Sequence, residues 1–329
     1  MKVLVVGGAG FIGSHVSDIL LARGYNVLCI DNLSSGSLEN IKHNLGNPKF
    51  QFKKLDILEK NVLFQEVDSV DAIVHLAAYK IPRYSSAINT LLINSQGTIN
   101  VLELARIRGA KFIIGSTSDV YGKNLQMPFK ENSDLVLGPS TSRRWAYAVS
   151  KLFDEHLAFA YQDEYNVKIV ILRYFGTYGE RQYLNWWGGP QGVFLEAIFK
   201  DQPVEIHGDG SQTRCFIYIK DAAEATVRAI EIEEAIGEII NIGAEEEISI
   251  LDLAKLMRKL SCVTSELKIK YVPYASFSKN YEDVKRRVPS IEKMKKILGY
   301  QPSQVDLKEG LKRLIDWYKT NKLNKRDDE

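Results

Sequence analysis

The stretch Val5-Val6-Gly7-Gly8-Ala9-Gly10-Phe11-Ile12-Gly13 follows a short apolar run and opens a segment with helical periodicity. In such a strand–turn–helix unit, Gly7 permits a tight turn, Gly10 lets the backbone approach a pyrophosphate, and Gly13 lets the helix pack on the strand. Three spaced glycines alone also fit a structural turn. Their placement favours a dinucleotide site, whose candidate residues here are Gly7, Gly10, Phe11, Ile12 and Gly13.

The end of the next apolar run supports this interpretation. Asp31 stands 18 residues beyond Gly13, where a carboxylate can accept hydrogen bonds from an adenosine ribose. Residues 32–35, beginning with Asn32, include no Arg or Lys that could hold a 2′-phosphate. We therefore predict NAD rather than NADP as the cofactor, with Asp31 and Asn32 beside its ribose.

Apolar runs bounded by Gly or Asx recur through the first half of the chain, at 3–6, 27–30, 72–76, 111–114 and 167–172. Helix-length segments lie between them, at 11–23, 87–108 and 145–165. Strands rich in Val, Ile and Leu that alternate with helices indicate a parallel sheet covered on both faces. We predict an α/β fold with a doubly wound parallel sheet, the Rossmann type.

The rhythm of the sequence changes after about Phe175. Aromatic and Gly residues cluster at 183–192, a turn follows at 207–212, and then come an apolar segment at 238–242 and a helix at 249–260. We predict a dinucleotide-binding domain of residues 1–175 and 215–243, and a smaller α/β substrate lobe of residues 176–214 and 244–329. The charged tail from residue 319 is expected to fray.

The composition excludes several classes of protein. With 329 residues, 45% hydrophobic and 26% charged, the chain is neither disordered nor a collagen or coiled coil. A net charge of +2 favours neither nucleic acid nor an anionic membrane as partner. The three cysteines lack the spacing of a metal or redox motif, so we expect reduced thiols and no metal. No apolar stretch approaches the ~18 residues of a membrane span and no signal peptide is evident, which predicts a cytoplasmic protein.

Two further motifs follow the glycine turn in order: Gly115-Ser116-Thr117-Ser118-Asp119-Val120-Tyr121-Gly122 and Tyr147-Ala148-Val149-Ser150-Lys151. Together they resemble the extended short-chain dehydrogenase/reductase family of NAD-dependent nucleotide-sugar epimerases, dehydratases and decarboxylases. The resemblance runs from Lys2 to about Tyr318. It implies a nucleotide-sugar substrate, with a UDP-sugar favoured, and a homodimer.

The chemistry of the second motif follows from its spacing. Tyr147 and Lys151 stand one helical turn apart on one face. An ammonium beside a phenol, with an oxidised nicotinamide nearby, lowers the phenol pKa, so Tyr147 is the candidate base. Thr117, at a strand end, can steady the oxyanion that develops on the substrate. Without this context, a solvated helix face would be the better interpretation of Tyr147 and Lys151.

The resemblance implies further cofactor contacts. Asp56-Ile57 resembles the pair beside the adenine, and Leu76-Ala77-Ala78 with Lys80 resembles the loop over the phosphates. Asn94 resembles a polar group near the cofactor, and Tyr174 lies in a segment similar to the loop on the nicotinamide side. Each could instead be an ordinary residue at a strand end or in a helix.

Two arginines resemble the family's ligands for the substrate diphosphate. Arg214 ends the turn 208–214 and Arg287 lies in the segment 283–290, and planar bidentate donors suit a diphosphate. Either could be a surface charge. Gly176 replaces the Asn that epimerases commonly have, so that contact must come from the backbone or another residue. The cluster 186–191 covers the base or sugar or forms a core aromatic patch, and Ser118 and Gln191 complete the candidate substrate residues.

The reaction itself is less well defined by the sequence. Dehydratases read Thr-Asp-Glu and UDP-glucuronate decarboxylases read Thr-Ser-Glu where this chain has Thr117-Ser118-Asp119. Arg144-Trp145 and residues 283–291 also resemble a decarboxylase, but Asp119 is one methylene shorter than the usual Glu, which weakens its acid–base geometry. Residues 179–194 resemble nucleotide-sugar 4-epimerases more closely. We therefore predict a 4-epimerase of a UDP-hexose or UDP-hexuronate, with Asp119 as a candidate catalytic residue or a strand-end residue. UDP-glucuronate decarboxylation is the alternative, and a 4,6-dehydratase or a non-catalytic NAD-binding protein is less favoured.

The resemblance to dimeric enzymes has a counterpart in two long segments. Residues 87–108 and 145–165 carry broad apolar surfaces that could form a four-helix dimer seam, with Leu152, Phe153, Leu157 and Phe159 on the second. Burial within one chain explains part of the same pattern.

Overall fold

A seven-stranded parallel sheet forms the centre of the computed structural model, which describes residues 1–80, 86–277, 281–302 and 305–323. Its strand order is β10-β6-β5-β4-β1-β2-β3, and every neighbouring pair is parallel. The strands are β1 (Lys2–Val6), β2 (Asn26–Asp31), β3 (Phe50–Lys54), β4 (Ala72–His75), β5 (Lys111–Thr117), β6 (Ile169–Tyr174) and β10 (Glu238–Ile242). The predicted α/β fold of the Rossmann type is confirmed.

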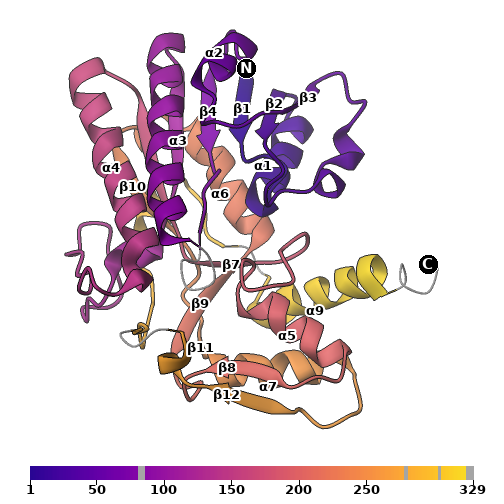
Figure 1. Ribbon diagram of the computed structural model, residues 1–329. Coiled ribbons are helices and arrows are strands. Elements are labelled where there is room, and N and C mark those ends of the chain that lie inside the picture. Colours follow the sequence, from indigo (N-terminus) through magenta and orange to yellow (C-terminus); the bar gives the residue numbers. More distant parts are fainter. Residues whose placement is uncertain (81–85, 278–280, 303–304, 324–329) are drawn as a thin grey trace.

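Helices cover both faces of this sheet, which explains why its strands are continuous apolar runs (Figure 1). On one face α1 (Phe11–Ala22) packs against α6 (Ile219–Glu231), and on the other α3 (Ala87–Arg108) packs against α4 (Ala146–Tyr165). The short α2 (Lys60–Glu66) packs its buried Leu63 into the core of the second face. Each face thus has its own hydrophobic core.

The carboxyl-terminal part of the chain builds a second, smaller layer below the sheet in Figure 1. Its strands form a three-stranded sheet and a two-stranded pair, from β7 (Gly176–Tyr178), β9 (Thr213–Tyr218), β11 (Glu247–Ser249), β8 (Val204–His207) and β12 (Ile269–Val272). Its helices are α5 (Pro190–Phe199), α7 (Ile250–Ser261) and α9 (Leu307–Tyr318), which share a third core. The remaining helix, α8 (Glu292–Ile297), precedes α9 in the chain and packs against β10.

The structure differs from the predicted elements mainly at their ends. The helix predicted at 145–165 starts at Ala146, because residues Arg143–Trp145 form a 3-10 turn. The strand predicted at 167–172 starts at Ile169, because Asn166 adopts a left-handed conformation that ends α4. After β9 the chain returns to the large sheet through α6 and β10. The predicted division of the chain into two domains, with one boundary near residue 215, stays a prediction.

The predicted fraying of the tail falls mostly on residues 324–329, which lie outside the described residues. Residues Lys319–Leu323 continue α9 as a π-helical turn. Among the described residues, no helix combines the length and apolar character needed to cross a membrane.

Candidate active site

A cavity of about 440 Å³ lies at the carboxyl ends of β1, β4, β5 and β6 and extends to the smaller layer. In doubly wound sheets this edge, where the strand order reverses between β1 and β4, is the usual ligand site. The predicted site residues that line the cavity are Gly7, Gly10, Phe11, Ile12, Gly13, Leu76, Ala78, Lys80, Thr117, Ser118, Asp119, Tyr147, Tyr174, Gln191, Arg214 and Arg287. The sequence motifs, distant along the chain, thus meet in one place.

The glycine turn is built as its spacing requires. Gly7 has φ +80°, and a Cβ there would stand 2.8 Å from the backbone nitrogen of Ala77. At Gly13 a Cβ would come within 2.3 Å of the Gly7 carbonyl oxygen. Gly10 is the N-cap of α1, and no side chain caps the helix, so its amino end can meet an anion such as a pyrophosphate.

Two further predicted cofactor residues, Asp31 and Asn32, are not among those that line the cavity, and they hold the loop after β2. Asp31 accepts hydrogen bonds from the backbone nitrogens of Ala9, at 3.1 Å, and Leu33, at 2.8 Å, and burial raises the pKa of its carboxyl. Asn32 donates to the Asp56 carboxylate at 2.9 Å. These contacts fix the loop after β2, and a bond from either carboxylate to a nucleoside stays a prediction.

The Asn94 side chain ties the loop after β4 to helix α4. It accepts a hydrogen bond from the Tyr79 nitrogen at 2.6 Å and donates to the Tyr79 oxygen at 3.0 Å and to the Ser150 hydroxyl at 2.9 Å. Ile57 packs beneath α3, where a Cβ at Gly97 would stand 2.5 Å from its Cδ1. Both residues position the loops that face the cavity.

Tyr147 and Thr117 line the cavity together. Thr117 ends β5, and its hydroxyl accepts a hydrogen bond from the Asp119 nitrogen at 3.2 Å. Burial raises the pKa of Tyr147, and the carboxylates of Asp119 and Asp154 raise it further. The sequence predicts a lowered pKa for Tyr147, but the chain by itself raises it, because burial and two carboxylates disfavour the phenolate.

Lys151 lies one turn along α4 from Tyr147 but is buried beneath the wall of the cavity. Its Nζ forms an ion pair of 2.8 Å with the Asp154 carboxylate, and both side chains are almost fully buried. The sequence interpretation did not include Asp154, although it shares the helix face three residues beyond Lys151.

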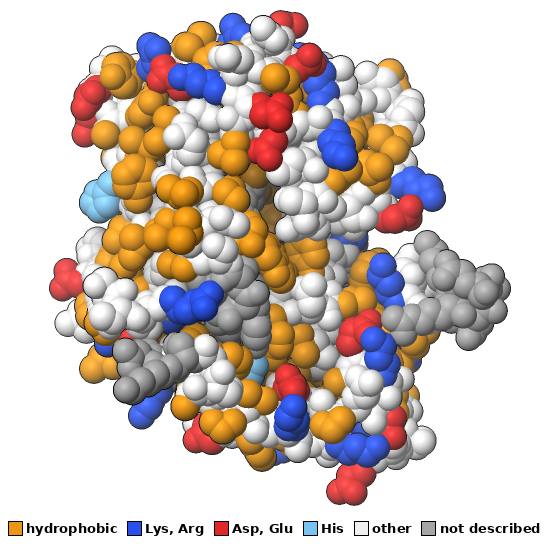
Figure 2. All heavy atoms as spheres, viewed as in Figure 1, with side chains coloured by type: hydrophobic (Ala, Val, Ile, Leu, Met, Phe, Trp, Pro, Cys, Tyr) orange, Lys and Arg blue, Asp and Glu red, His pale blue; other side chains and the backbone are white. Residues whose placement is uncertain are grey.

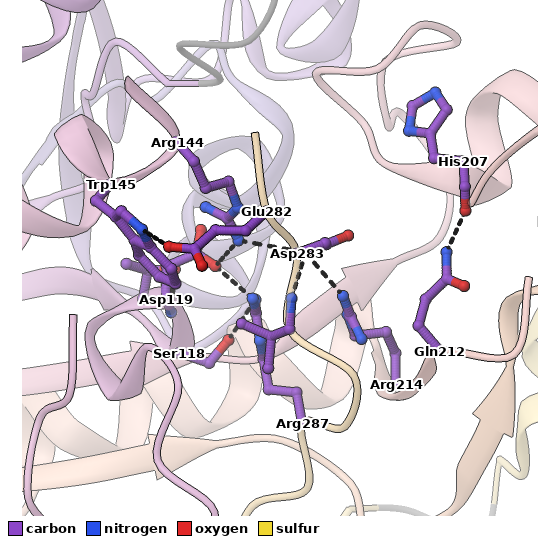
Figure 3. A network of polar contacts seen from close by, with 12 residues as sticks. Ser118, Asp119, Arg144, Trp145, His207, Gln212, Arg214, Glu282, Asp283 and Arg287 are labelled. Atoms are coloured by element: carbon purple, nitrogen blue, oxygen red, sulfur yellow. Dashed lines mark hydrogen bonds and ion pairs between the residues drawn. The ribbon is translucent and has the colours of Figure 1, made fainter. Parts of the chain in front are cut away.

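Three arginines and two carboxylates form a cluster in the wall of the cavity (Figure 3). Asp119 bonds to Arg144 Nη2 at 3.0 Å and to Arg287 Nη2 at 2.6 Å. Asp283 bonds to Arg214 Nη2 at 3.3 Å and lies 3.8 Å from Arg144 Nη2. The cluster carries one more positive than negative charge, which suits an anionic ligand.

The buried environment shapes the charges in this arginine cluster. Burial, together with the neighbouring guanidiniums of Arg214 and Arg144, lowers the pKa of Arg287 to about 10, although the Asp119 carboxylate opposes this lowering. The pKa of Arg144 is raised by Asp119 and Asp283, which overcome its burial. At neutral pH both guanidiniums are charged, so the cluster keeps its excess positive charge.

The aromatic segment after β7 lines the same cavity. Trp186 stacks on His207 with ring centres 4.0 Å apart, and Trp187 meets Tyr79 edge to face at 5.5 Å. Both rings contact other aromatic side chains and also face the cavity. The structure is therefore compatible with both interpretations of residues 186–191, as a cover for the base or sugar and as an aromatic patch. Gln191 is buried at the start of α5, and its Nε2 lacks a hydrogen-bond partner among the described residues.

The structure explains the unusual glycine after Phe175. A Cβ at Gly176 would stand 2.5 Å from the Phe216 ring and 2.9 Å from the Cys215 oxygen. No larger side chain fits without displacing β9, because β7 and β9 are paired at this point.

Several cavity residues were not among the predicted site residues. Arg144 and Asp283 were noted only as parts of a decarboxylase-like segment, and Tyr183, His207 and Gln212 line the cavity without a motif that singles them out. Their partners lie far away in sequence, as Arg214 and Asp283 do at a separation of 69 residues. Spacing alone could not reveal such pairs.

Comparison with known proteins assigns the chain to a family. Residues 3–243 match the profile of the NAD dependent epimerase/dehydratase family. The chain belongs to this family. It is 36% identical over 321 residues to the UDP-N-acetyl-alpha-D-glucosaminuronate decarboxylase of Bacillus cytotoxicus, covering 97% of this chain and 98% of the relative.

Further similar proteins include enzymes of two activities. UDP-glucuronic acid decarboxylase 4 of Arabidopsis thaliana is 35% identical over 317 residues, with 96% of this chain and 68% of the relative covered. The crystal structure of UDP-glucuronic acid 4-epimerase from Bacillus cereus with UDP-glucuronic acid and NAD is 33% identical, with a TM-score of 0.86. That match covers 97% of this chain and 99% of the other.

The protein is an NAD-dependent enzyme of this family, and its cofactor is NAD. The chain fits that group, because the glycine turn leaves room for a pyrophosphate at the bare amino end of α1 and the loop after β2 carries no cation at 32–35. Among the described residues, no group of three or more His, Cys, Asp or Glu could hold a metal ion.

Proposed function

We propose that the enzyme decarboxylates a nucleotide-linked hexuronate, with UDP-glucuronate or its 2-N-acetylated counterpart as substrate. The observation that carries this proposal is the position of Asp119, whose carboxylate lies in the cavity wall between Arg144 and Arg287. The sequence favours epimerisation because an Asp is shorter than the Glu of decarboxylases. The shorter side chain is a weaker argument against decarboxylation once the structure is considered, since the Asp119 carboxylate still lines the cavity.

The first step that we propose is common to both candidate reactions. Tyr147 takes the proton of the sugar 4-hydroxyl, and the Thr117 hydroxyl donates a hydrogen bond to the same oxygen. Lys151 lies one helical turn from Tyr147, and its ammonium is held in an ion pair with Asp154. When bound, NAD supplies the hydride acceptor for C4 and returns the hydride at the end of the reaction.

The second step depends on the carboxylate of the sugar. A ketone at C4 stands β to the C5 carboxylate, so CO₂ can leave and the electrons pass to the ketone oxygen. Carbon C5 must then take a proton, and we propose that Asp119, held by two guanidiniums, orients the water that delivers it. The hydroxide left behind takes a proton from solvent, so each turnover releases one CO₂ and consumes one proton. Thr117 and Tyr147 stabilise the oxygen that carries the negative charge.

We propose that Arg214 and Arg287 bind the substrate diphosphate. Both line the cavity, and Arg287 also donates to the Ser118 hydroxyl at 3.4 Å. A diphosphate needs more positive charge than one guanidinium supplies, and the excess charge of the arginine cluster provides it. Gln191, whose buried Nε2 has no partner in the described part of the chain, is proposed as a donor to the sugar or base.

Epimerisation at C4 of the same substrate is the second candidate. It needs Tyr147, Thr117 and a sugar that turns in the cavity, and no group that protonates C5. The similarity in fold to a UDP-glucuronic acid 4-epimerase favours it. The two reactions part after the ketone forms, so the products distinguish them.

The test incubates the enzyme and NAD with UDP-glucuronate, UDP-N-acetylglucosaminuronate, UDP-glucose and UDP-N-acetylglucosamine in separate reactions. Mass spectrometry and chromatography then identify the products. Loss of CO₂ from a uronate supports the proposal, whereas an isomer of unchanged mass establishes epimerisation. The Tyr147→Phe variant is the blank, and Asp119→Glu restores the missing methylene and is expected to retain decarboxylation.

We also propose a homodimer formed through α3 and α4. Their outward faces expose Ile88 by 68%, Leu92 by 62% and Phe153 by 46%. Figure 2 shows hydrophobic side chains gathered over this side of the molecule. Light scattering is expected to give a dimer mass for the wild type and a monomer mass for a Leu92→Asp, Phe153→Asp double variant.

A further inference from the structure

A buried ion pair beneath the cavity is not explained by the steps proposed above. Lys151 and Asp154 both point into the protein, with exposures of 1% and 0%, and their charged atoms are 2.8 Å apart. Removing two charges from water is expensive, and an apolar pair would fill the space at lower cost. A buried carboxylate next to the lysine therefore calls for a functional explanation.

The carboxylate of Asp154 acts on Tyr147 in two ways. It lies close enough to raise the pKa of the phenol by direct repulsion of a phenolate. It also draws on the positive charge of Lys151, which would otherwise stabilise that phenolate. Both effects have the same sign, so both favour a protonated Tyr147.

The other charged groups around this pair do not cancel the effect. His75, on β4, is nearly fully buried, and its pKa is lowered to about 3 by burial and by the Lys151 charge, so it is neutral at physiological pH. Glu155, next along α4, is paired with Arg173 at 2.7 Å.

Two charged groups that line the same cavity as Tyr147, Asp119 and Lys80, have opposite charges. Asp119 raises the pKa of the phenol. Burial lowers the pKa of Lys80 to about 8, although the Asp119 charge opposes that lowering. At neutral pH Lys80 therefore stays mostly protonated and offsets the charge of Asp119, which leaves the charge of Asp154 as a separate influence on Tyr147.

We propose that Asp154 is a positioning residue which holds the Lys151 ammonium and keeps Tyr147 protonated until the oxidised cofactor enters the cavity. The proposal rests on the role proposed for Tyr147 as the base. The phenol then gives up its proton only when the oxidised cofactor is in place. Asp154 thereby makes the deprotonation of Tyr147 depend on bound oxidised cofactor, without contacting the substrate.

The test measures the titration of Tyr147 directly. Protein with NAD bound and carrying ¹³Cζ-labelled tyrosine is titrated by NMR, and the Tyr147 signal is assigned by its loss in Tyr147→Phe. In Asp154→Asn we expect a midpoint lower than in the wild type by about one pH unit or more. Because no substrate is needed, this result is independent of which reaction the enzyme performs.

The matched control is Thr98→Val. Burial raises the pKa of Asp154, and Lys151 and a hydrogen bond from Thr98 oppose that rise. The Thr98 hydroxyl also lies 3.2 Å from His75 Nε2, but it carries no charge. Its removal tests whether any disturbance of the buried network shifts Tyr147, and we expect a midpoint equal to that of the wild type.

Three outcomes would overturn the proposal. The first is a midpoint in Asp154→Asn that coincides with the wild-type value, and the second is an equal shift in Thr98→Val. If wild-type Tyr147 does not titrate before the protein unfolds, the expected result is a measurable midpoint in Asp154→Asn, and its absence is the third. Should Asp154→Asn fail to fold, Asp154→Ser, which leaves room for a water beside Lys151, is measured in its place by the same criteria.

Discussion

Replacing Asp119 by Asn is expected to destabilise the protein through the arginine cluster. The exchange leaves Asp283 as the remaining carboxylate among three guanidiniums, so the net charge of the cluster rises from +1 to +2. Removing one partner of a buried ion pair costs about 3–5 kcal/mol. Because the Asp119 side chain is 17% exposed, we expect the lower end of that range, about 3 kcal/mol.

Urea unfolding is the assay for this prediction. With a denaturant slope of about 3 kcal/mol per M, the midpoint is expected to fall by about 1 M. UDP at roughly 100 times its dissociation constant should restore up to about 2.7 kcal/mol of the unfolding free energy of Asp119→Asn, because its phosphates supply the missing negative charge. The control is Asp163→Asn at an exposed position of α4, with an expected change below about 0.5 kcal/mol. Equal midpoints for Asp119→Asn and the wild type would refute the electrostatic reasoning.

Three further predictions concern the cofactor side and the pH dependence of stability. Tyr147→Phe should abolish turnover and leave NAD binding nearly unchanged, as measured by product assay and calorimetry, and near-full activity would remove Tyr147 from the mechanism. Gly13→Ala should weaken NAD binding by about tenfold or more, because the added Cβ would stand 2.3 Å from the Gly7 oxygen and move the turn; unchanged affinity would contradict this. Burial lowers the pKa of His15 from 6.5 to about 4, so the unfolded chain binds an extra proton between these values. Stability should therefore fall by up to about 1.4 kcal/mol per pH unit as the pH drops from 6.5 to 4, and His15→Asn should show a shallower fall in urea titrations.

The first half of the fold follows from local sequence patterns. The bounds predicted for the helix 87–108 are those of α3, because its ends carry a Ser86 cap and a left-handed Gly109. In contrast, α6 and β3 were not predicted. Their places depend on packing against α1 and pairing with β2, which are contacts between distant parts of the chain.

The site residues likewise fall into those that local patterns predicted and those that depend on contacts between distant parts of the chain. Motifs identified the glycine turn, Thr117, Tyr147 and Lys151, since each belongs to a local stretch with a recognisable spacing. The partner of Lys151 was missed because an Asp three residues on along a helix is usually a solvated charge. The pairing of Asp119 with Arg287 joins residues that no local pattern connects, so only the tertiary structure reveals it.

The cavity wall draws on residues from Gly7 to Arg287, and this order affects how the protein is made. A ribosome releases the glycine turn long before Arg287. The half of the cavity that fits the cofactor can thus be complete in a nascent chain while the substrate half still lacks one of its guanidiniums. Until then Asp119 lacks the partner at 2.6 Å and depends on Arg144 for its positive neighbour.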